Sequence, residues 1–338
     1  MSQLRVTVSG VRNRTHIVYV SSWLRQAVAT AGGSATLVEI NCAGRVEAEI
    51  DRPDNVLSGI DVTLVDRHAS GVGPHAFVSI GSPAMRAWLR FRCSPSAWPL
   101  RTVVVDEGIG SYGDIATKRA AMRREGSKEP WTTVRAWAGV AARRVLPDES
   151  WRLYEQDETS WALNEAVAAE FRRATSQRAS RGVVFLTQPW VDHGLIAEDA
   201  YIGHLAGVEA AVRRTGVDFA IRPHPTEPPG RYAAFDVLSS ALPAELDPDV
   251  LGARLVLGET STALLNLAAV HGLPAARVVG PLAEVGSIAL SESQAALFTR
   301  FVPVSVTTDL VGAVVEGSAR DGLEGAEHLD SALDADGG

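Results

Sequence analysis

Short apolar runs alternate with stretches of helical periodicity along the first part of the chain. The runs are rich in Val and Ile and end at polar or glycine residues, which is typical of parallel strands covered on both faces. The predicted strands are residues 16–20, 35–40, 59–65, 75–80 and 102–105. One helix is predicted after Ser21 and Ser22, which can cap it, and another over residues 85–92. This alternation predicts a doubly wound α/β unit.

The same alternation starts again near residue 182, after a stretch of different character. Residues 113–180 carry four tryptophans and long helical patterns, notably over residues 153–175. Beyond them the predicted strands are residues 182–187, 217–221, 253–257, 275–279 and 301–306, and the predicted helices are residues 199–214 and 263–271. Gly272 can end the last helix in a left-handed conformation. The pattern therefore predicts a second doubly wound unit.

These patterns divide the chain into four segments. Residues 1–145 form the first unit, residues 146–180 a helical linker and residues 181–315 the second unit. Residues 316–338 hold seven acidic residues against one arginine and few large apolar groups, so we expect a disordered acidic tail. At 338 residues the chain has the length of two domains, and its 46% hydrophobic content lets each bury a core.

Charge and cysteine content narrow the classes of function. The net charge of −8 argues against nucleic-acid binding, which needs a basic surface. Cys42 and Cys93 lack metal-binding or redox spacing, so we expect reduced, buried thiols in a cytoplasmic protein. No apolar run approaches the length of a membrane span, and the first residues lack a signal-peptide core. Peripheral association with the inner face of a membrane stays open.

Three polar clusters follow predicted strands, and the first is Asp106-Glu107-Gly108. Open α/β sheets bind ligands at the carboxyl ends of their strands, where these two carboxylates fall. A carboxylate there can act as a general base that takes the proton of an attacking hydroxyl. Gly108–Gly113 also matches G-x-G-x-x-G, but carboxylates precede the glycines and no acidic strand end follows at the expected distance. A flexible turn that positions Asp106 is the better interpretation, and it includes Glu107 and Gly108.

The second cluster is Arg222-Pro223-His224-Pro225, after the strand at residues 217–221. The prolines on both sides restrict the backbone of His224 to extended geometry. A histidine held there can bind a phosphate by a hydrogen bond or protonate a departing one. Arg222 adds a permanent positive charge that suits a phosphate.

The third cluster, Thr260-Ser261-Thr262, opens a predicted helix. Hydroxyls there can cap the helix, and the free N–H groups of a helix N-terminus can also bind a phosphate. Thr187 and Gln188 end another strand, where they could contact a nucleotide base or ribose. Asp192 and His193 lack a third ligand at a suitable spacing, so we predict no metal site. Each cluster alone fits an ordinary turn or cap, but the three together favour one composite site.

Together these motifs resemble those of the bacterial sialyltransferases and polysialyltransferases of capsule and lipooligosaccharide synthesis. That family has an acidic pair before glycine, a His-Pro pair and a Ser-Ser or Ser-Thr pair, and the order matches over residues 16–310. The resemblance implies a GT-B-like α/β fold, with two Rossmann-like units facing a central cleft. It also implies an inverting, metal-independent and cofactor-free transfer of sialic acid from CMP-sialic acid to a glycan hydroxyl.

The resemblance assigns roles to individual residues. Asp106 would be the general base, and His224 would contact the CMP phosphate and act as the acid for the leaving group. Ser261 and Thr262 would hold that phosphate, and Glu245 would hold the ribose. The first unit would then bind the acceptor and the second the donor. Thr262 stands where the family often has serine, and Arg222 stands where lysine or a variable residue is expected.

Three other functions remain compatible with the residues. Glycerophosphotransferases that use CDP-glycerol share the His-Pro and Ser-rich motifs, although they rely on more than one catalytic histidine. Nucleotide-sugar epimerases share the fold and need no acceptor, and a non-catalytic nucleotide binder would show no turnover. Between Lys118 and Arg144 lie eight Lys and Arg residues against two Glu residues. This basic stretch is either a solvated helix face or a site for an anionic acceptor or acidic lipid headgroups.

Overall fold

The computed structural model divides the chain into two compact units. Unit 1 comprises Met1–Ser176 and Leu290–Ala296, and unit 2 comprises Gln177–Ala289 and Leu297–Gly338. The structure describes residues 4–30, 36–42, 57, 62–64, 75–93, 101–124, 126–157, 160–175, 181–228, 230–280 and 290–318. Within these residues, no helix is long and apolar enough to cross a membrane.

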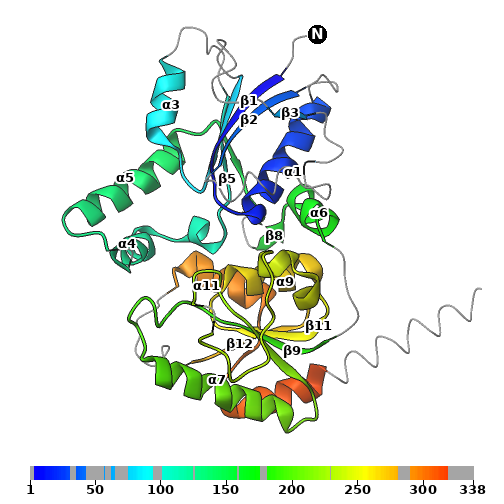
Figure 1. Ribbon diagram of the computed structural model, residues 1–338. Helices are drawn as coiled ribbons and strands as arrows, with labels where there is room; N and C mark the ends of the chain where they lie inside the picture. Colours follow the sequence, from blue (N-terminus) through cyan, green and yellow to red (C-terminus); the bar gives the residue numbers. More distant parts are fainter. Residues whose placement is uncertain are drawn as a thin grey trace, which may run out of the picture. The chain divides into compact units, whose positions relative to one another are not determined.

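Unit 1 is built on a six-stranded sheet (Figure 1). Its strands are β1 (Leu4–Val11), β2 (Thr36–Cys42), β3 (Val62–Leu64), β4 (Ala76–Ile80), β5 (Arg101–Val105) and β6 (Glu149–Trp151). They are all parallel and follow the order β3-β2-β1-β4-β5-β6, which is the doubly wound order of Rossmann folds. The strands β7 (Tyr154–Gln156) and β8 (Trp161–Leu163) form a separate antiparallel pair.

Helices cover both faces of this sheet. The helices of unit 1 are α1 (Arg14–Thr30), α3 (Met85–Arg92), η1 (Ile109–Tyr112), α4 (Ile115–Arg124), α5 (Trp131–Val145) and α6 (Glu165–Arg173). In Figure 1, α1 and α6 lie on one side of the sheet, and α3 and α5 lie on the other. Tyr19 of α1 packs edge-on against Phe171 of α6, with ring centroids 5.3 Å apart.

Unit 2 has a five-stranded parallel sheet. Its strands are β9 (Arg181–Leu186), β10 (Phe219–Arg222), β11 (Ala253–Gly258), β12 (Ala275–Val278) and β13 (Ser305–Val306). Their order is β10-β9-β11-β12-β13, so the direction of winding reverses between β9 and β11. Such a reversal marks the place where open α/β sheets bind ligands, beyond the carboxyl ends of the strands.

The remaining elements complete unit 2. They are α7 (Glu198–Arg213), η2 (Ala244–Leu246), α8 (Pro248–Leu251), α9 (Thr262–His271), the end of α11 (Glu292–Phe301), η3 (Thr308–Leu310) and the helical residues 311–318. The helices α7 and α9 lie on opposite faces of the sheet (Figure 1). Val183 and Phe185 of β9 belong to the core that α7 covers, and their neighbours Val184 and Leu186 are buried as well. This double burial explains the continuous apolar runs of the sequence.

The two sheets confirm the predicted α/β class with two Rossmann-like units. Eight of the ten predicted strands fall on observed strands, with their ends shifted by a few residues. The predicted helices at 85–92, 199–214 and 263–271 likewise fall on observed helices. Gly272 ends α9 in the left-handed conformation, as predicted. The predicted strand at 301–306 was largely wrong, because α11 runs to Phe301 and only Ser305–Val306 forms β13. Of the predicted acidic tail, residues 316–318 are helical and the rest lies outside the described residues.

The predicted strand at residues 16–20 was wrong, because these residues lie inside α1. Asn13 starts this helix, since its side-chain oxygen accepts a hydrogen bond from the N–H of His16 at 3.0 Å. Residues 14–24 are all buried, so the helix shows a continuous apolar run instead of an amphipathic pattern. Ser21 and Ser22 therefore cap nothing and lie within α1. The first strand of the sheet is instead Leu4–Val11, which the sequence analysis missed.

The helical linker predicted at residues 146–180 was also wrong. Trp151 lies in β6, which pairs with β5 and completes the sheet of unit 1. The only helix that the structure describes in this segment is α6, and Asn164 caps it by accepting from the N–H of Ala166 at 3.1 Å. The segment thus belongs to unit 1, which extends to Ser176. Cys93 is exposed, contrary to expectation, and the side chain of Cys42 lies outside the description.

Candidate functional site

Three strands of unit 2 bring their polar clusters to one edge of the sheet. Leu186 of β9 lies in register with Arg222 of β10 on one side and with Gly258 of β11 on the other. Because the strands are parallel, the residues that follow these three positions leave the sheet at the same edge. The structure therefore brings the second and third sequence clusters to one edge, together with Thr187 and Gln188 after β9, whereas the first cluster lies in unit 1.

Gln188 joins two of these clusters across the point where the winding reverses. Its side-chain oxygen accepts hydrogen bonds from both the N–H and the hydroxyl of Thr260, each at 3.1 Å. Its own N–H donates to the hydroxyl of Tyr201 at 3.2 Å. The predicted role of Gln188 was a nucleotide contact, but its carbonyl group is engaged in holding the turn that precedes α9.

His224 is half-buried, and its hydrogen bonds define which ring nitrogen faces outward. The N–H of Thr226 donates to Nδ1 at 3.3 Å, and the Thr226 hydroxyl lies 2.8 Å from the same nitrogen. Burial lowers the pKa of His224 below its ordinary value, so the neutral form prevails at neutral pH. With Nδ1 accepting, the proton of the neutral ring sits on Nε2, which can donate to a phosphate oxygen.

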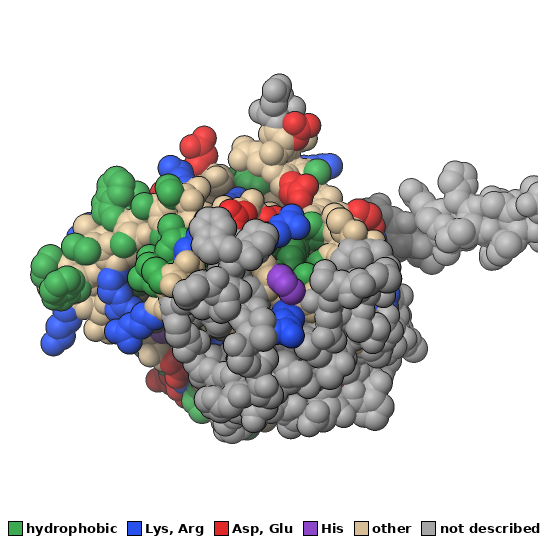
Figure 2. Space-filling view, turned by 90° about the horizontal axis from the view of Figure 1, so that it is seen from above, with side chains coloured by type: hydrophobic (Ala, Val, Ile, Leu, Met, Phe, Trp, Pro, Cys, Tyr) green, Lys and Arg blue, Asp and Glu red, His purple; other side chains and the backbone are tan. Residues whose placement is uncertain are grey.

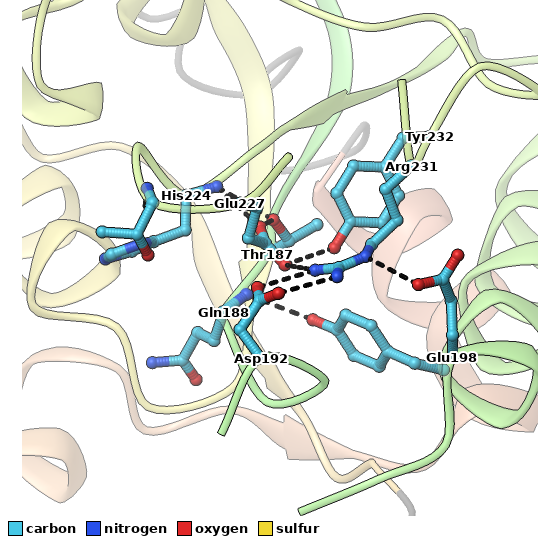
Figure 3. A network of polar contacts seen from close by, with 10 residues as sticks. Thr187, Gln188, Asp192, Glu198, His224, Glu227, Arg231 and Tyr232 are labelled. Atoms are coloured by element: carbon cyan, nitrogen blue, oxygen red, sulfur yellow. Dashed lines mark hydrogen bonds and ion pairs between the residues drawn. The ribbon is translucent and has the colours of Figure 1, made fainter. Parts of the chain in front are cut away.

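A buried carboxylate, Glu227, holds the backbone of the His224 turn (Figure 3). Glu227 Oε2 accepts from the N–H of His224 at 2.8 Å and from the hydroxyl of Thr187. Glu227 Oε1 accepts from the hydroxyl of Tyr232 at 2.5 Å. The Thr187 oxygen also accepts from the N–H of His224 at 3.1 Å. Thr187 is thus 3% exposed and supports His224, instead of offering its hydroxyl to a nucleotide as predicted.

Arg231 completes this support from the other side (Figure 3). Its guanidinium lies 3.5 Å from Glu227 and binds Asp192 through two hydrogen bonds of 2.8 Å. Glu198 lies 3.3 Å from the same guanidinium. Asp192, and to a smaller extent Glu198, raise the pKa of Arg231, so its charge is permanent. The sequence analysis missed Glu227, Arg231 and Tyr232, although the position of Glu227 three residues after His224 could have suggested a local turn.

The third cluster forms the start of α9. The Ser261 hydroxyl accepts a hydrogen bond from the N–H of Ala263 at 3.1 Å, so Ser261 is the cap of this helix. Ser261 and Thr262 are both partly exposed. A Cβ atom at Gly258 would approach the Leu186 carbonyl to 3.4 Å, so glycine permits the close packing of β11 against β9 here. The start of α9 thus places a partly exposed hydroxyl beside the positive end of a helix, and its role as a phosphate site stays a prediction.

The predicted phosphate contact of Arg222 was wrong. Its guanidinium donates to the carbonyl oxygens of Leu238, Ser240 and Leu242, at 3.1, 2.9 and 2.5 Å. Asp247 lies 3.3 Å from the same group, and Arg222 is 7% exposed. Arg222 therefore fixes the segment that follows β10, and its guanidinium is buried against protein groups.

Two further carboxylates near this edge are buried. Glu245, the predicted ribose contact, lies in η2 and is 6% exposed, and its role stays a prediction. Glu259 follows β11 directly, and its Oε2 accepts from Trp190 Nε1 at 2.8 Å. Burial raises the pKa of Glu259 to about 7, although Trp190 and Arg277 act against this shift.

In unit 1, Asp106 ends β5 and is fully buried. Its Oδ2 accepts from the hydroxyl of Tyr112 and from the N–H of Leu153, the latter at 3.1 Å. Arg143 lies 3.5 Å from Oδ1 and also donates to the carbonyl oxygen of Ser111 at 2.9 Å. Burial raises the pKa of Asp106, against the opposing effects of these donors. In this structure the predicted general base is thus enclosed by protein groups.

Glu107, the next residue, is exposed and turns back over the neighbouring strand β4. A Cβ atom at Gly81 would lie 2.1 Å from Glu107 Oε2, so the carboxylate occupies the space above this glycine. Gly81 has a φ of 69° and Gly108 a φ of 104°, and both turns therefore favour glycine. Burial lowers the pKa of Lys118 while the charge of Glu107 raises it, which places this ammonium group near the carboxylate.

The turn that carries Glu107 is fixed by groups that the sequence analysis missed. Tyr112 lies in η1 and packs edge-on against Tyr154 and Trp161, with ring centroids 5.6 and 5.7 Å away. Within the unit 1 segment Leu290–Ala296, Ser291 donates to the Tyr112 carbonyl at 3.1 Å and Gln294 to the Ile109 carbonyl at 2.9 Å. The first and last glycines of the apparent nucleotide motif, Gly108 and Gly113, thus flank a short helix whose tyrosine binds Asp106.

Among the described residues, no group of three or more His, Cys, Asp or Glu side chains could hold a metal ion. The sequence matches no family model, and it matches no curated protein. The fold is similar to that of CalG4, the calicheamicin glycosyltransferase, with 11% identity, 94% of this chain and 90% of that chain covered, and a TM-score of 0.49.

Two other solved structures are similar at the same level. One is the alpha/beta-galactoside alpha-2,3-sialyltransferase of the luminous marine bacterium Photobacterium phosphoreum, with 8% identity, coverage of 91% and 99%, and a TM-score of 0.48. The other is a proposed UDP-N-acetylglucosamine 2-epimerase of Listeria monocytogenes, with 11% identity, coverage of 88% and 87%, and a TM-score of 0.48. With such identities and TM-scores below 0.5, these similarities do not bear on the activity of this chain.

Proposed function

We propose that this protein is an inverting, metal-independent glycosyltransferase of the GT-B type. It would transfer sialic acid from CMP-sialic acid to a hydroxyl group of a glycan acceptor. Unit 2 would bind the donor and unit 1 the acceptor. The observation that carries the proposal is the common edge of β9, β10 and β11, where His224 follows β10 and α9 follows β11, the two strands that flank β9.

This edge suits the phosphate of a nucleotide-activated sugar. The start of α9 offers backbone N–H groups and the positive end of the helix dipole, and Ser261 lies there partly exposed. His224 adds a second donor, Nε2–H, on the turn that follows β10. In the reaction, the bond between the anomeric carbon and the phosphate oxygen breaks as the acceptor oxygen bonds to that carbon. These donors would stabilise the negative charge that the departing CMP acquires.

The acceptor proton would pass to a carboxylate of unit 1. The family resemblance assigns this role to Asp106, but its Oδ2 is occupied by Tyr112 and Leu153 and no part of it is exposed. Glu107 is exposed at the same strand end, and a substrate can reach it without any rearrangement. We therefore assign the general base to Glu107 and give Asp106 the role of positioning the turn that carries it.

Thermal unfolding with added CMP, UDP or CDP-glycerol tests the donor assignment. A ligand at about 100 times its Kd stabilises a protein by roughly 2.7 kcal/mol, which is a readily measured rise in Tm. We expect CMP to stabilise the protein and UDP to have no effect. Release of CMP from CMP-sialic acid, measured with a panel of glycan acceptors, then tests the transfer itself.

Two substitutions at Ser261 test whether the phosphate binds at the start of α9. Asn and Asp are both good helix caps, so Ser261→Asn and Ser261→Asp should unfold at similar temperatures without ligand. Only the aspartate would repel a phosphate, and we expect it alone to abolish the CMP-induced rise in Tm. Stabilisation by UDP instead of CMP would contradict the donor assignment and favour an epimerase or another glycosyltransferase. Stabilisation by CDP-glycerol but not CMP would favour a glycerophosphotransferase.

A further inference from the structure

The helix α5 of unit 1 presents an apolar stripe to solvent. Its members recur at helical spacing along one side, and all are exposed: Trp131, Val134, Ala138, Ala141 and Val145. Trp131 is 69% exposed, Val134 52% and Val145 79%. Trp137, which is 59% exposed, lies beside this stripe. We call these six residues the α5 stripe.

The inner side of α5 lacks the large apolar side chains that a packed helix usually buries. Its buried positions are Thr132 and Ala136. Further along this side, a Cβ atom at Gly139 would lie 3.3 Å from the side chain of Lys118 of α4. Arg143 donates a hydrogen bond to the Ser111 carbonyl. Small and polar residues thus attach α5 to unit 1, while its large apolar side chains are left uncovered. Amphipathic helices normally bury such a stripe, so its exposure indicates a partner.

Positive charge surrounds the α5 stripe. Residues 118–144 carry eight Lys and Arg residues against two Glu residues, in a chain whose net charge is −8. Arg119 and Arg123 share Glu129, which leaves most of this charge without an acidic neighbour in the segment. Arg135 and Arg144 are exposed on α5 itself. In Figure 2, Lys and Arg side chains lie beside exposed hydrophobic ones on the projection that Figure 1 shows to be α4 and α5.

We propose that α4 and α5 dock on the surface of an anionic lipid bilayer, with the α5 stripe inserted at the level of the headgroups. Tryptophan favours this interfacial zone because its ring is apolar and its N–H is polar. A helix that combines such an apolar side with flanking arginines binds in the plane of an anionic membrane. Each nearby Lys or Arg adds attraction to the acidic headgroups.

A second copy of the chain is a poorer occupant of this surface. A two-fold contact through the α5 stripe would bring together two identical segments of high positive charge. That repulsion opposes self-association, whereas the same charge strengthens binding to an anionic bilayer. The charge pattern therefore selects the lipid surface over a copy of the chain.

Docking through α5 would also bring the candidate acceptor site close to the bilayer. Arg143, on the inner side of α5, lies 3.5 Å from Asp106 and holds the turn before Tyr112. A glycan acceptor that is anchored in the membrane would then approach unit 1 from the bilayer side. This consequence rests on the proposed function, but the docking itself does not.

Flotation of the full-length protein with vesicles tests the proposal. We expect it to float with phosphatidylcholine vesicles that contain phosphatidylglycerol and to stay in solution with phosphatidylcholine alone. Trp131→Ser combined with Trp137→Ser should weaken binding by at least about tenfold, because the apolar contact is lost. The matched control is Val304→Ser combined with Leu310→Ser, which removes exposed apolar side chains of unit 2 and should leave binding unchanged.

The electrostatic contribution is tested separately. Arg135→Ala and Arg144→Ala should each weaken binding by roughly fivefold, and raising the ionic strength should weaken it further. Failure of the wild-type protein to float with anionic vesicles would overturn the proposal. So would unchanged binding of the double tryptophan variant. A dimer in light scattering that this variant converts to a monomer would assign the α5 stripe to a second copy instead.

Discussion

Unit 1 and unit 2 use the same device to fix a turn after a strand. In each, a buried carboxylate accepts hydrogen bonds from a tyrosine hydroxyl and a backbone N–H, with an arginine 3.5 Å away. Asp106 binds Tyr112 and Leu153 in unit 1, and Arg143 is its arginine. Glu227 binds Tyr232 and His224 in unit 2, and Arg231 is its arginine.

The difference lies in where the anchoring carboxylate falls relative to the recognisable motif. In unit 2 the anchor, Glu227, follows the His-Pro motif and leaves the ring of His224 half-exposed. In unit 1 the anchor is Asp106 itself, the residue that the motif marks as catalytic, and Glu107 is the exposed member of the pair. A motif thus marks a candidate position in the fold, but burial decides which of its residues are exposed to a substrate.

Replacing Glu107 and Asp106 of unit 1 by their amides, one at a time, is the strongest test of this difference between the two units. We expect Glu107→Gln to lower kcat/KM for sialyl transfer by about 10²- to 10⁴-fold, the usual contribution of a general base. Because Glu107 is exposed, the Tm of this variant should match that of the wild type. Asp106→Asn keeps an acceptor for Tyr112 but leaves Arg143 without its charge partner. It should lower the Tm and retain activity within roughly tenfold.

The reverse result would restore Asp106 as the base. It would show that the enclosed carboxylate opens during turnover, and the anchor in unit 1 would then differ from Glu227 in function as well as position. Steady-state rates and melting curves of both variants, measured at one pH, separate the two outcomes.

Removing the anchor of unit 2 should give the next largest effect. Glu227→Ala removes the acceptor of the Tyr232 and Thr187 hydroxyls and of the His224 N–H, and we expect a loss of about 3 kcal/mol in the free energy of unfolding. The matched control is Asp192→Ala, which removes a more exposed partner of the same Arg231 and should cost a small fraction of that. Urea denaturation followed by circular dichroism measures both. Equal losses would mean that Arg231, not Glu227, is the anchor.

The fold could be predicted to the extent that burial leaves a simple pattern. Strands such as β9 are covered on both faces and appear as continuous apolar runs. The prediction for α1 was wrong for the same reason, because this helix is buried on all sides over residues 14–24 and its sequence is a continuous apolar run. The central strand β1 was missed because polar residues, among them Thr7 and Ser9, interrupt its valines.

For the candidate site, the sequence could predict where the residues lie in the fold but not which of their groups remain available. The clusters at Asp106, His224 and Ser261 do end parallel strands, as the sequence indicated. Which groups remain available depends on partners far along the chain, such as the carbonyl oxygens that occupy Arg222. No spacing rule connects a charged side chain to carbonyl groups in an irregular segment. For that reason Arg222 looked like a phosphate ligand in the sequence and proved to be a structural residue.

A third buried carboxylate sharpens the comparison, because Glu259 lacks the anchoring partners of the other two. Its Oε2 accepts one hydrogen bond, from Trp190, and its Oε1 has no hydrogen-bond partner among the described residues. The nearby Arg277 donates to the backbone oxygen of Glu259 through its Nε. Burial raises the pKa of this carboxyl from 4.5 to about 7. The folded protein therefore keeps this proton up to about pH 7, whereas the unfolded chain loses it near pH 4.5.

Stability should consequently fall as the pH rises between these two values, because the unfolded chain binds fewer protons there. The effect of Glu259 is at most about 3 kcal/mol, and it is complete above pH 7. His204 and His224 have lowered pKa values and act in the opposite direction, so the wild type must be compared with Glu259→Gln at each pH. The amide keeps the acceptor for Trp190 and does not ionise. We expect the variant to gain stability relative to the wild type from pH 5 to pH 8 in urea denaturation. A constant difference between the two proteins would mean that folding does not raise the pKa of Glu259.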